Sequence, residues 1–307
     1  MGTAEILNSL AMIFIMIVPG FVLKKKKIIN ETQTKGISSL IVNVTWPCLV
    51  IDAMQLKFSK EILNDCIYTF FILIIIFVLA FIFSILVVKL CKLEKSKSGI
   101  LAFMFIFGNT GFIGLPVINA LYGKTAAFYA SIIEMVNDIL IFTVGIMLIQ
   151  YSAGTKTKMD LKGLLSPGIF GVVVGFTLFM TNTQLPGFLG DTVQIIGSAT
   201  TPLSMIVIGS QLAELKIKEL ISVEISMMTI FKLLVIPLLS ILLIRIILGD
   251  SSLLSTVIIL DFAMPVGACI TIFSQQYDAD VEFATKGVLV STLFCLLTVP
   301  VFAIMLK

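Results

Sequence analysis

The sequence predicts an all-α integral membrane protein with ten transmembrane helices, and three observations lead to this prediction. Of its 307 residues, 58% are hydrophobic and only 13% are charged, whereas soluble domains carry about 25% charged residues. The mean hydropathy is +1.12. Apolar runs of roughly the 20 residues that cross a bilayer recur along the whole chain. A water-soluble fold is therefore excluded.

Each predicted span is an apolar run bounded by charged residues, glycine or proline. The spans leave only short loops, so no soluble domain remains to carry separate chemistry. They divide into a first five-helix unit at residues 1–151 and a second at 164–307, joined by a short cytoplasmic linker at 152–163. The predicted spans are residues 4–23, 35–55, 65–90, 99–121, 126–151, 164–182, 191–213, 221–248, 253–275 and 282–306.

The positive charges predict the orientation of the spans. The loops after the first, third, fifth, seventh and ninth spans hold 15 Lys and Arg residues, against four in the alternate loops. Cytoplasmic loops carry the excess of positive charge, so the first set is predicted to be cytoplasmic. We therefore expect a multi-pass protein of the cell membrane with both termini extracellular. The net charge of +3 reflects this topology and does not indicate a nucleic acid partner.

The two five-helix units are predicted to be related by inversion. Five spans is an odd number, so two related units enter the membrane from opposite sides. The second span carries Thr45-Trp46-Pro47 where the seventh carries Thr200-Thr201-Pro202, and the fourth and ninth spans each contain a proline near mid-membrane, Pro116 and Pro265. Inverted repeats of this kind are common in secondary transporters.

Two spans are predicted to be broken within the membrane. Residues 108–116 (GNTGFIGLP) of the fourth span combine three glycines, a proline and two polar side chains, and residues 261–268 (DFAMPVGA) repeat the pattern in the ninth. Glycine weakens a helix, proline removes a backbone donor, and the freed polar groups need protein or a water-filled cavity. Ordinary kinks eased by neighbouring helices are the alternative. Two breaks in corresponding places instead indicate a substrate site.

Helix N-termini at the breaks offer unpaired N–H groups and a partial positive charge, which suit a carboxylate. A small organic anion is therefore the predicted substrate. Asn109 is the strongest candidate, because an amide both donates and accepts hydrogen bonds; a helix-to-helix hydrogen bond is its structural alternative. Trp46, the single tryptophan, lies mid-span, which fits packing or a cavity wall, and packing is favoured. The predicted substrate-binding residues are Asn109, Thr110, Gly111, Pro116, Met264, Pro265 and Gly267.

Ionisable side chains inside a membrane are costly and mark candidate functional residues. Glu134 and Asp138 are four residues apart and so share one face of the fifth span, with Asn137 between them. Asp261 precedes the ninth-span break, and Lys232 lies midway along the eighth span. These five residues are candidates for coupling transport to H+ or Na+. A structural bridge between Lys232 and one of the carboxylates is the other interpretation.

Four segments resemble the auxin efflux carrier family, which includes the plant PIN proteins and many bacterial carriers. The likeness covers essentially the whole chain, although the loop after the fifth span is short here and long in many plant members. On this resemblance the chain is identified as a bacterial member of the family. The segments are 42–54 (VNVTWPCLVIDAM), 108–123 (GNTGFIGLPVINALYG), 197–215 (GSATTPLSMIVIGSQLAEL) and 264–280 (MPVGACITIFSQQYDAD).

The resemblance implies a fold of two inverted five-helix repeats whose fourth and ninth helices cross at their prolines, beside the substrate. It places Asn109 at the substrate site. It also implies a scaffold made of the first, second, sixth and seventh spans, against which the other spans move as an elevator. The family resemblance further implies a homodimer in the lipid bilayer.

These features together predict a secondary transporter and not an enzyme. The chain has no histidine, and its five cysteines are scattered without a CxxC pair, so neither a metal site nor a cofactor is expected. The alternative is an intramembrane aspartyl-type enzyme, in which Asp138 and Asp261 share a proton and activate water.

Overall fold

The computed structural model describes residues 2–90, 93–160, 163–214, 222–248 and 252–306, and the regular elements of these residues are helices. The predicted cytoplasmic residues Lys92, Lys162, Lys216 and Lys218 lie outside the described residues. The helices are α1 (Thr3–Ile15), α2 (Ile17–Lys25), α3 (Glu31–Leu40), η1 (Ile41–Thr45), α4 (Trp46–Ala53), α5 (Lys60–Leu90), α6 (Lys95–Ile106), η2 (Thr110–Gly114), α7 (Leu115–Leu140), η3 (Ile141–Gly145), α8 (Ile146–Ser152), η4 (Gly163–Leu165), α9 (Pro167–Met180), α10 (Gly187–Ser198), α11 (Thr200–Leu212), α13 (Val223–Ile230), η5 (Phe231–Val235), α14 (Ile236–Leu248), α15 (Leu253–Phe262), α16 (Cys269–Gln276) and α17 (Val281–Met305).

Seven helical stretches among the described residues are long and apolar enough to cross a membrane. This confirms the predicted class, an all-helical, multi-pass membrane protein. Two further apolar helices, Pro167–Met180 and Leu253–Phe262, are shorter. The count of ten spans and the inverted repeats stay predictions. The seven stretches are Thr3–Lys25, Glu31–Ala53, Lys60–Lys89, Thr110–Ser152, Gly187–Leu212, Val223–Ile246 and Val281–Met305.

Polar caps in the sequence set where several of these helices begin. The side chains of Asn30, Ser166, Ser222 and Ser252 each accept a hydrogen bond from a backbone N–H in the first turn of α3, α9, α13 and α15. Asp280 does the same for α17. A cap satisfies one of the N–H groups that a helix start leaves without a partner. In an apolar chain, these few polar residues therefore fix the helix boundaries.

Gly123 marks the turn between the predicted fourth and fifth spans. The stretch Thr110–Ser152 is continuous by its hydrogen bonds, but Gly123 has φ 76° and ψ −168°, which is not helical. Glycine reaches this region readily because it has no Cβ. The break in helical conformation falls inside the predicted loop at residues 122–125.

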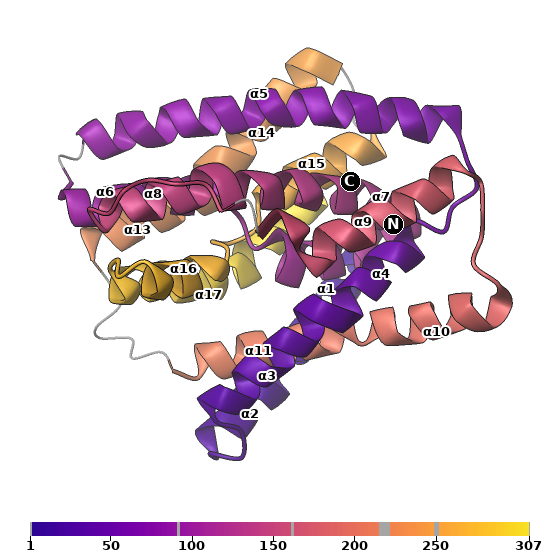
Figure 1. Cartoon of the computed structure of the whole chain (residues 1–307), viewed down its shortest axis with the longest axis horizontal. Helices are drawn as coiled ribbons and strands as arrows, with labels where there is room; N and C mark the ends of the chain where they lie inside the picture. Colours follow the sequence, from indigo (N-terminus) through magenta and orange to yellow (C-terminus); the bar gives the residue numbers. More distant parts are fainter. Residues whose placement is uncertain (1, 91–92, 161–162, 215–221, 249–251, 307) are drawn as a thin grey trace.

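The helices form two groups that pack against each other. Within the first, here called the scaffold group (residues 3–53 and 167–212), α11 packs against α2 and α3, and α4 packs against α9 and α10. The second, here called the crossing group (residues 60–152 and 223–305), contains the packed pairs α5 with α6, α6 with α8, α14 with α15 and α16 with α17. In Figure 1, α5 runs across the upper part of the view, and α10 and α11 lie in the lower part, with α2 extending below them.

The scaffold group contains a helix crossing that only glycine permits. A Cβ on Gly20 of α2 would lie 2.0 Å from the backbone oxygen of Ile206, and a Cβ on Gly209 of α11 would lie 2.0 Å from that of Ile17. Real Cβ atoms do not approach a carbonyl oxygen so closely. Small residues at such contacts let membrane helices pack backbone to backbone.

Candidate functional site

Two interrupted helices cross in the middle of the molecule. After α6 ends at Ile106, Gly108 forms an isolated antiparallel bridge with Val266, which follows the end of α15. The backbone N–H of Asn109 donates to the carbonyl of Pro265 at 2.6 Å, and that of Gly267 donates to the carbonyl of Phe107 at 3.2 Å. The unwound segments therefore satisfy each other's polar groups, which a membrane interior requires of non-helical backbone.

A serine of α17 completes the backbone bonding at the crossing. The N–H of Val266 donates to Ser291 Oγ at 3.1 Å, and the Ser291 hydroxyl donates to the carbonyl of Val288 in its own helix, also at 3.1 Å. Ser291 is fully buried. Ser291 is not among the residues predicted from the sequence. A serine within an apolar span was the available signal, because such hydroxyls often bond across membrane helices.

The crossing point in the fourth span differs from the prediction. In the ninth span, Pro265 lies in the crossing as expected, but in the fourth span the crossing is at Gly108, and Pro116 is the second residue of α7. Proline is tolerated in the first turn of a helix, where its missing N–H has no intrahelical partner. The π-helical turn η2 intervenes between the crossing and Pro116. Pro116 therefore lies in the first turn of α7, and the helix is interrupted earlier, at Gly108 and Asn109.

A polar cluster lies directly beside the crossing. The hydroxyl of Thr110 donates a hydrogen bond to Glu134 Oε2, and Asn137 Nδ2 donates to Thr110 Oγ1 at 3.0 Å. Asn109 Oδ1 accepts from the N–H of Phe112 at 3.3 Å and caps η2. The structure thus brings together Asn109, Thr110, Glu134 and Asn137, which the sequence analysis had placed in two separate candidate sets.

Two predicted glycines give this cluster its close packing. A Cβ on Gly111 would lie 2.8 Å from Glu134 Oε1. A Cβ on Gly267 would lie 3.1 Å from the carbonyl oxygen of Gly108. Both glycines therefore let polar atoms approach the crossing backbone. Either position would be crowded by any larger residue.

Asp261, near the end of α15, approaches the same polar cluster. Its carboxyl oxygen Oδ1 would be 3.6 Å from a Cβ on Gly114, and the side chain of Met264 would be 3.2 Å from the same point. Glu134 is within electrostatic range of Asp261 and of Asp138. Asp261 is 4% exposed and Glu134 is 6% exposed, so these carboxyl groups are held away from bulk water.

Lys232 supplies positive charge to this region. Its side chain is fully buried, and its Nζ has no hydrogen-bond partner among the described residues. It lies within electrostatic range of Asp261. The interpretation of Lys232 as a countercharge inside the bundle stays a prediction. With all groups ionised, the three carboxylates of Glu134, Asp138 and Asp261 outnumber this one ammonium.

The geometry does not favour an aspartyl enzyme. No hydrogen bond joins Asp138 to Asp261 in the part of the chain that the structure describes. Asp138 lies within electrostatic range of Glu134, four residues before it on the same helix. A catalytic dyad needs two carboxyl groups close enough to share one proton.

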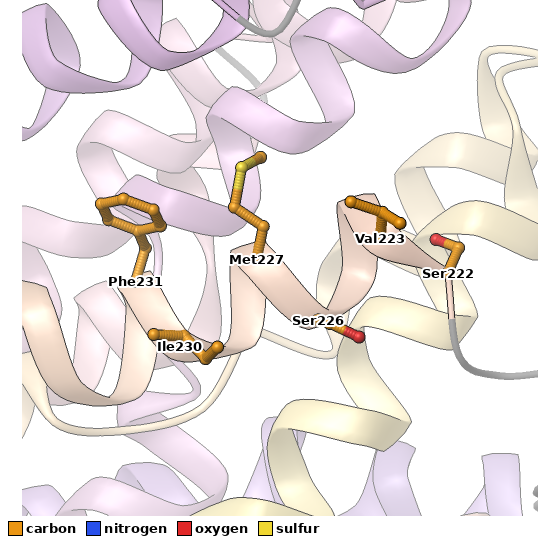
Figure 2. Close-up of a pocket in the computed structure, with 6 residues that line it drawn as sticks. All are labelled: Ser222, Val223, Ser226, Met227, Ile230 and Phe231. Atoms are coloured by element: carbon orange, nitrogen blue, oxygen red, sulfur yellow. The ribbon is translucent and has the colours of Figure 1, made fainter.

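Two surface hollows lie away from the crossing. Figure 2 shows the first, of about 450 Å³, on α13 and η5, with the side chains that line it. The second, of about 360 Å³, is lined almost entirely by apolar side chains of α5, α7 and α9. Neither hollow includes a residue of the crossing. The first is lined by Ser222, Val223, Ser226, Met227, Ile230 and Phe231.

The fold and the crossing define a class of protein. A helical, multi-pass membrane protein in which two interrupted helices meet beside buried carboxyl groups has the architecture of a membrane transporter. The chain matches the family described as membrane transport protein over residues 5–303. It belongs to this family, the auxin efflux carrier family.

Two of three known proteins similar to the chain are named as transporters. An uncharacterized transporter of Methanocaldococcus jannaschii is 24% identical over 298 residues, which cover 94% of each chain. An uncharacterized transporter of Methanothermobacter thermautotrophicus is 21% identical over 308 residues, which cover 100% of this chain and 99% of the relative. The lysosomal cholesterol signaling protein of Mus musculus is 26% identical over 321 residues, which cover 95% of this chain but 36% of that protein. The chain is therefore a transporter and not an enzyme.

Proposed function

We propose that the protein is a secondary carrier that moves a small organic anion across the cytoplasmic membrane by alternating access. The observation that carries this proposal is the crossing of the two unwound segments, because broken helices that meet in the membrane form the substrate sites of many carriers. The substrate binds at the crossing, against Asn109, Thr110 and Gly111 on one side and Met264, Pro265 and Gly267 on the other. Pro116 contributes by starting α7 and not by contact.

The helix ends at the crossing support an anionic substrate. The helical run that η2 begins at Thr110, and α16, which begins at Cys269, both start directly after the crossing segments. Each start carries a partial positive charge and N–H groups that can face a carboxylate. A carboxylate there would be bound by backbone dipoles and by the amide of Asn109.

The excess of buried carboxyl groups supports coupling to a cation. Glu134 and Asp261 are buried and Asp138 is partly buried near Glu134, whereas Lys232 is the one buried lysine among the described residues. An anion entering beside them is repelled unless H+ or Na+ neutralises part of this charge. We therefore propose that positive charge enters the cluster together with the substrate. Transport measured at varied pH and varied sodium distinguishes the two ions.

The two helix groups support an elevator mechanism. In this proposal the scaffold group stays fixed and the crossing group carries the substrate across the bilayer, with both termini extracellular and two copies of the chain forming a dimer. The contacts between the groups include α4 with α7 and α11 with η2. Those contacts change in each transport cycle.

Replacing Asn109 tests the substrate site. Asn109→Ala removes both the cap of η2 and the amide donor, whereas Asn109→Asp keeps an oxygen that can cap η2 but brings a negative charge toward the anion. We expect both variants to lose at least about tenfold in initial rate, since a lost hydrogen bond to a charged group is worth roughly 1.5 kcal/mol or more. Only the alanine variant should also lose about 1 kcal/mol of stability.

The rates are measured as uptake of radiolabelled acetate, succinate and malate into liposomes that contain the purified protein. Stability is followed by thermal melting of the same preparations. Uptake of at least one of these anions by the wild type, with wild-type rates in both Asn109 variants, would remove the crossing as the substrate site. Uptake of none of them would count against an organic anion carrier.

An ion pair between the two groups tests the proposed movement. Asp52 of α4 and Lys124 of α7 lie 2.8 Å apart, between Oδ1 and Nζ, and they join the scaffold group to the crossing group. Partly exposed pairs contribute only about 0.2–1 kcal/mol, so we expect Asp52→Asn to change the transport rate by roughly two- to fivefold. The exchanged pair Asp52→Lys with Lys124→Asp should restore it. An unchanged rate in both single and exchanged variants would show that this contact is not remade during transport.

A further inference from the structure

Trp46 has a buried donor without a partner. Its side chain is 7% exposed, and the indole Nε1 makes no hydrogen bond with any described residue. A buried tryptophan N–H usually finds an acceptor, because leaving such a group unpaired costs about 1–3 kcal/mol. The packing interpretation of Trp46 accounts for the ring but leaves this N–H without a function.

The ring has a fixed orientation. A Cβ on Gly168 of α9 would lie 1.7 Å from Trp46 Cζ3 and 2.8 Å from Cε3. The benzo edge of the indole thus fills the space that the glycine leaves open. On the opposite edge, Cζ2 would lie 3.7 Å from a Cβ on Gly111. Cζ2 is bonded to the carbon that carries Nε1, so the edge of the ring next to the N–H lies beside Gly111, in the turn that follows the crossing.

Trp46 therefore lies beside η2, the turn that directly follows the crossing, and approaches it from the scaffold group. Gly111 is two residues beyond Asn109, and the space beside it also borders Glu134 Oε1, which would be 2.8 Å from a Cβ there. The indole N–H only donates, so it selects an acceptor atom and rejects a cation. It is held by a rigid ring and needs little reordering to bind.

We propose that the indole N–H of Trp46 donates a hydrogen bond to an acceptor oxygen of the transported organic acid, from the scaffold group. This assignment rests on the proposed function, and it adds a specificity-determining residue from outside the two broken helices. The bound substrate then lies between the crossing and α4. Because Trp46 belongs to the scaffold group, its hydrogen bond is made in one state of the carrier and is lost when the crossing group moves.

The chain itself carries the reporter for the first test, because Trp46 is its single tryptophan. Tryptophan emission of the purified protein is titrated with acetate, succinate and malate, the same anions used in the transport assay. A transported anion should change the emission saturably, with a midpoint close to its transport KM. An anion that is transported through an Asn109-dependent route yet leaves the emission unchanged at saturating concentration would overturn the assignment.

A second test removes the N–H alone. Trp46 is replaced by benzothienylalanine, in which sulfur takes the place of the N–H while the ring keeps its shape, and also by phenylalanine. We expect the isostere to raise the KM for the transported anion by about tenfold, the effect of one lost hydrogen bond to a charged acceptor. Maximal turnover should change by less than about twofold. Since the ring still fills the space at Gly168, this result is independent of whether Trp46→Phe folds.

The remaining outcomes separate this assignment from the proposed function. An isostere with the wild-type KM overturns the assignment, and a lowered melting temperature with an unchanged KM does so as well, because the N–H then bonds within the protein. In both cases the proposed function is still supported if the wild type transports an anion and this transport depends on Asn109. If the wild type moves none of the three anions, the proposed function fails and the assignment fails with it.

Discussion

Replacing Gly209 with leucine is expected to abolish the folded protein. A Cβ at this position would lie 2.0 Å from the carbonyl oxygen of Ile17, and one on Gly20 would lie 2.0 Å from that of Ile206. The obstacle is backbone on both helices, so neither side chain rotation nor a small shift relieves it. Overpacking already costs about 1–3 kcal/mol in adaptable cores, and here α2 and α11 must separate. We expect Gly20→Leu to have the same effect.

The measurement is the yield of monodisperse protein after detergent extraction, together with its melting temperature. Gly36→Ala is the matched control, because a Cβ on Gly36 in α3 meets no atom within 4 Å. Alanine there should fold as the wild type or slightly better, since it is the stronger helix former. Normal yield and melting of Gly209→Leu would show that α2 and α11 do not pack backbone to backbone.

Removing the positive charge of Lys232 is expected to destabilise the protein by about 3 kcal/mol, the cost of leaving a buried charge without its countercharge. Lys232→Met keeps the length of the side chain but leaves Asp261, which is 4% exposed, without the ammonium in its electrostatic range. Asp261→Asn removes the carboxylate and leaves the ammonium of Lys232 buried without a negative charge in its electrostatic range. The double variant should recover most of the stability, because neither charge is then buried alone.

Thermal melting of the wild type, the two single variants and the double variant gives the coupling between these residues. Lys57→Met is the control for a lysine on the exposed surface, and it should change stability by less than about 0.5 kcal/mol. Additive effects of Lys232→Met and Asp261→Asn would mean that the two charges do not compensate each other. Lys232 would then need another role, such as direct contact with the substrate.

Several features of the fold were predictable because they depend on local composition. Apolar length and the scarcity of charge identified a multi-pass helical membrane protein, and Gly, Asn and Pro in residues 108–116 indicated that the fourth span is broken. The depth of Glu134, Asp261 and Lys232 within apolar runs marked them as unusual residues. All three are buried in the structure.

Other features depended on which segments meet. The family resemblance implied a crossing at Pro116 in the fourth span, and proline is a strong helix breaker, yet the chain leaves the helix at Phe107 and Gly108, where Val266 and Gly267 supply backbone partners. The spacing of residues along the chain does not indicate the hydrogen bond between Thr110 and Glu134. Nor does it indicate the hydrogen bond that the N–H of Val266 donates to Ser291. Trp46 was assigned to packing because its unpaired N–H becomes visible only once its neighbours are known.

By itself, the sequence determined that this protein is helical and lies in a membrane. It also determined that the chain carries polar segments at membrane depth in which a helix is easily interrupted. Hydropathy, charge and the conformational preferences of glycine and proline are properties of short stretches, so they can be read without knowing the fold. Only the tertiary structure decided where the two breaks cross, which carboxyl groups gather there and which edge of the Trp46 ring faces them. These depend on distances between residues far apart in the chain, such as Gly108 and Val266, and packing alone sets those distances.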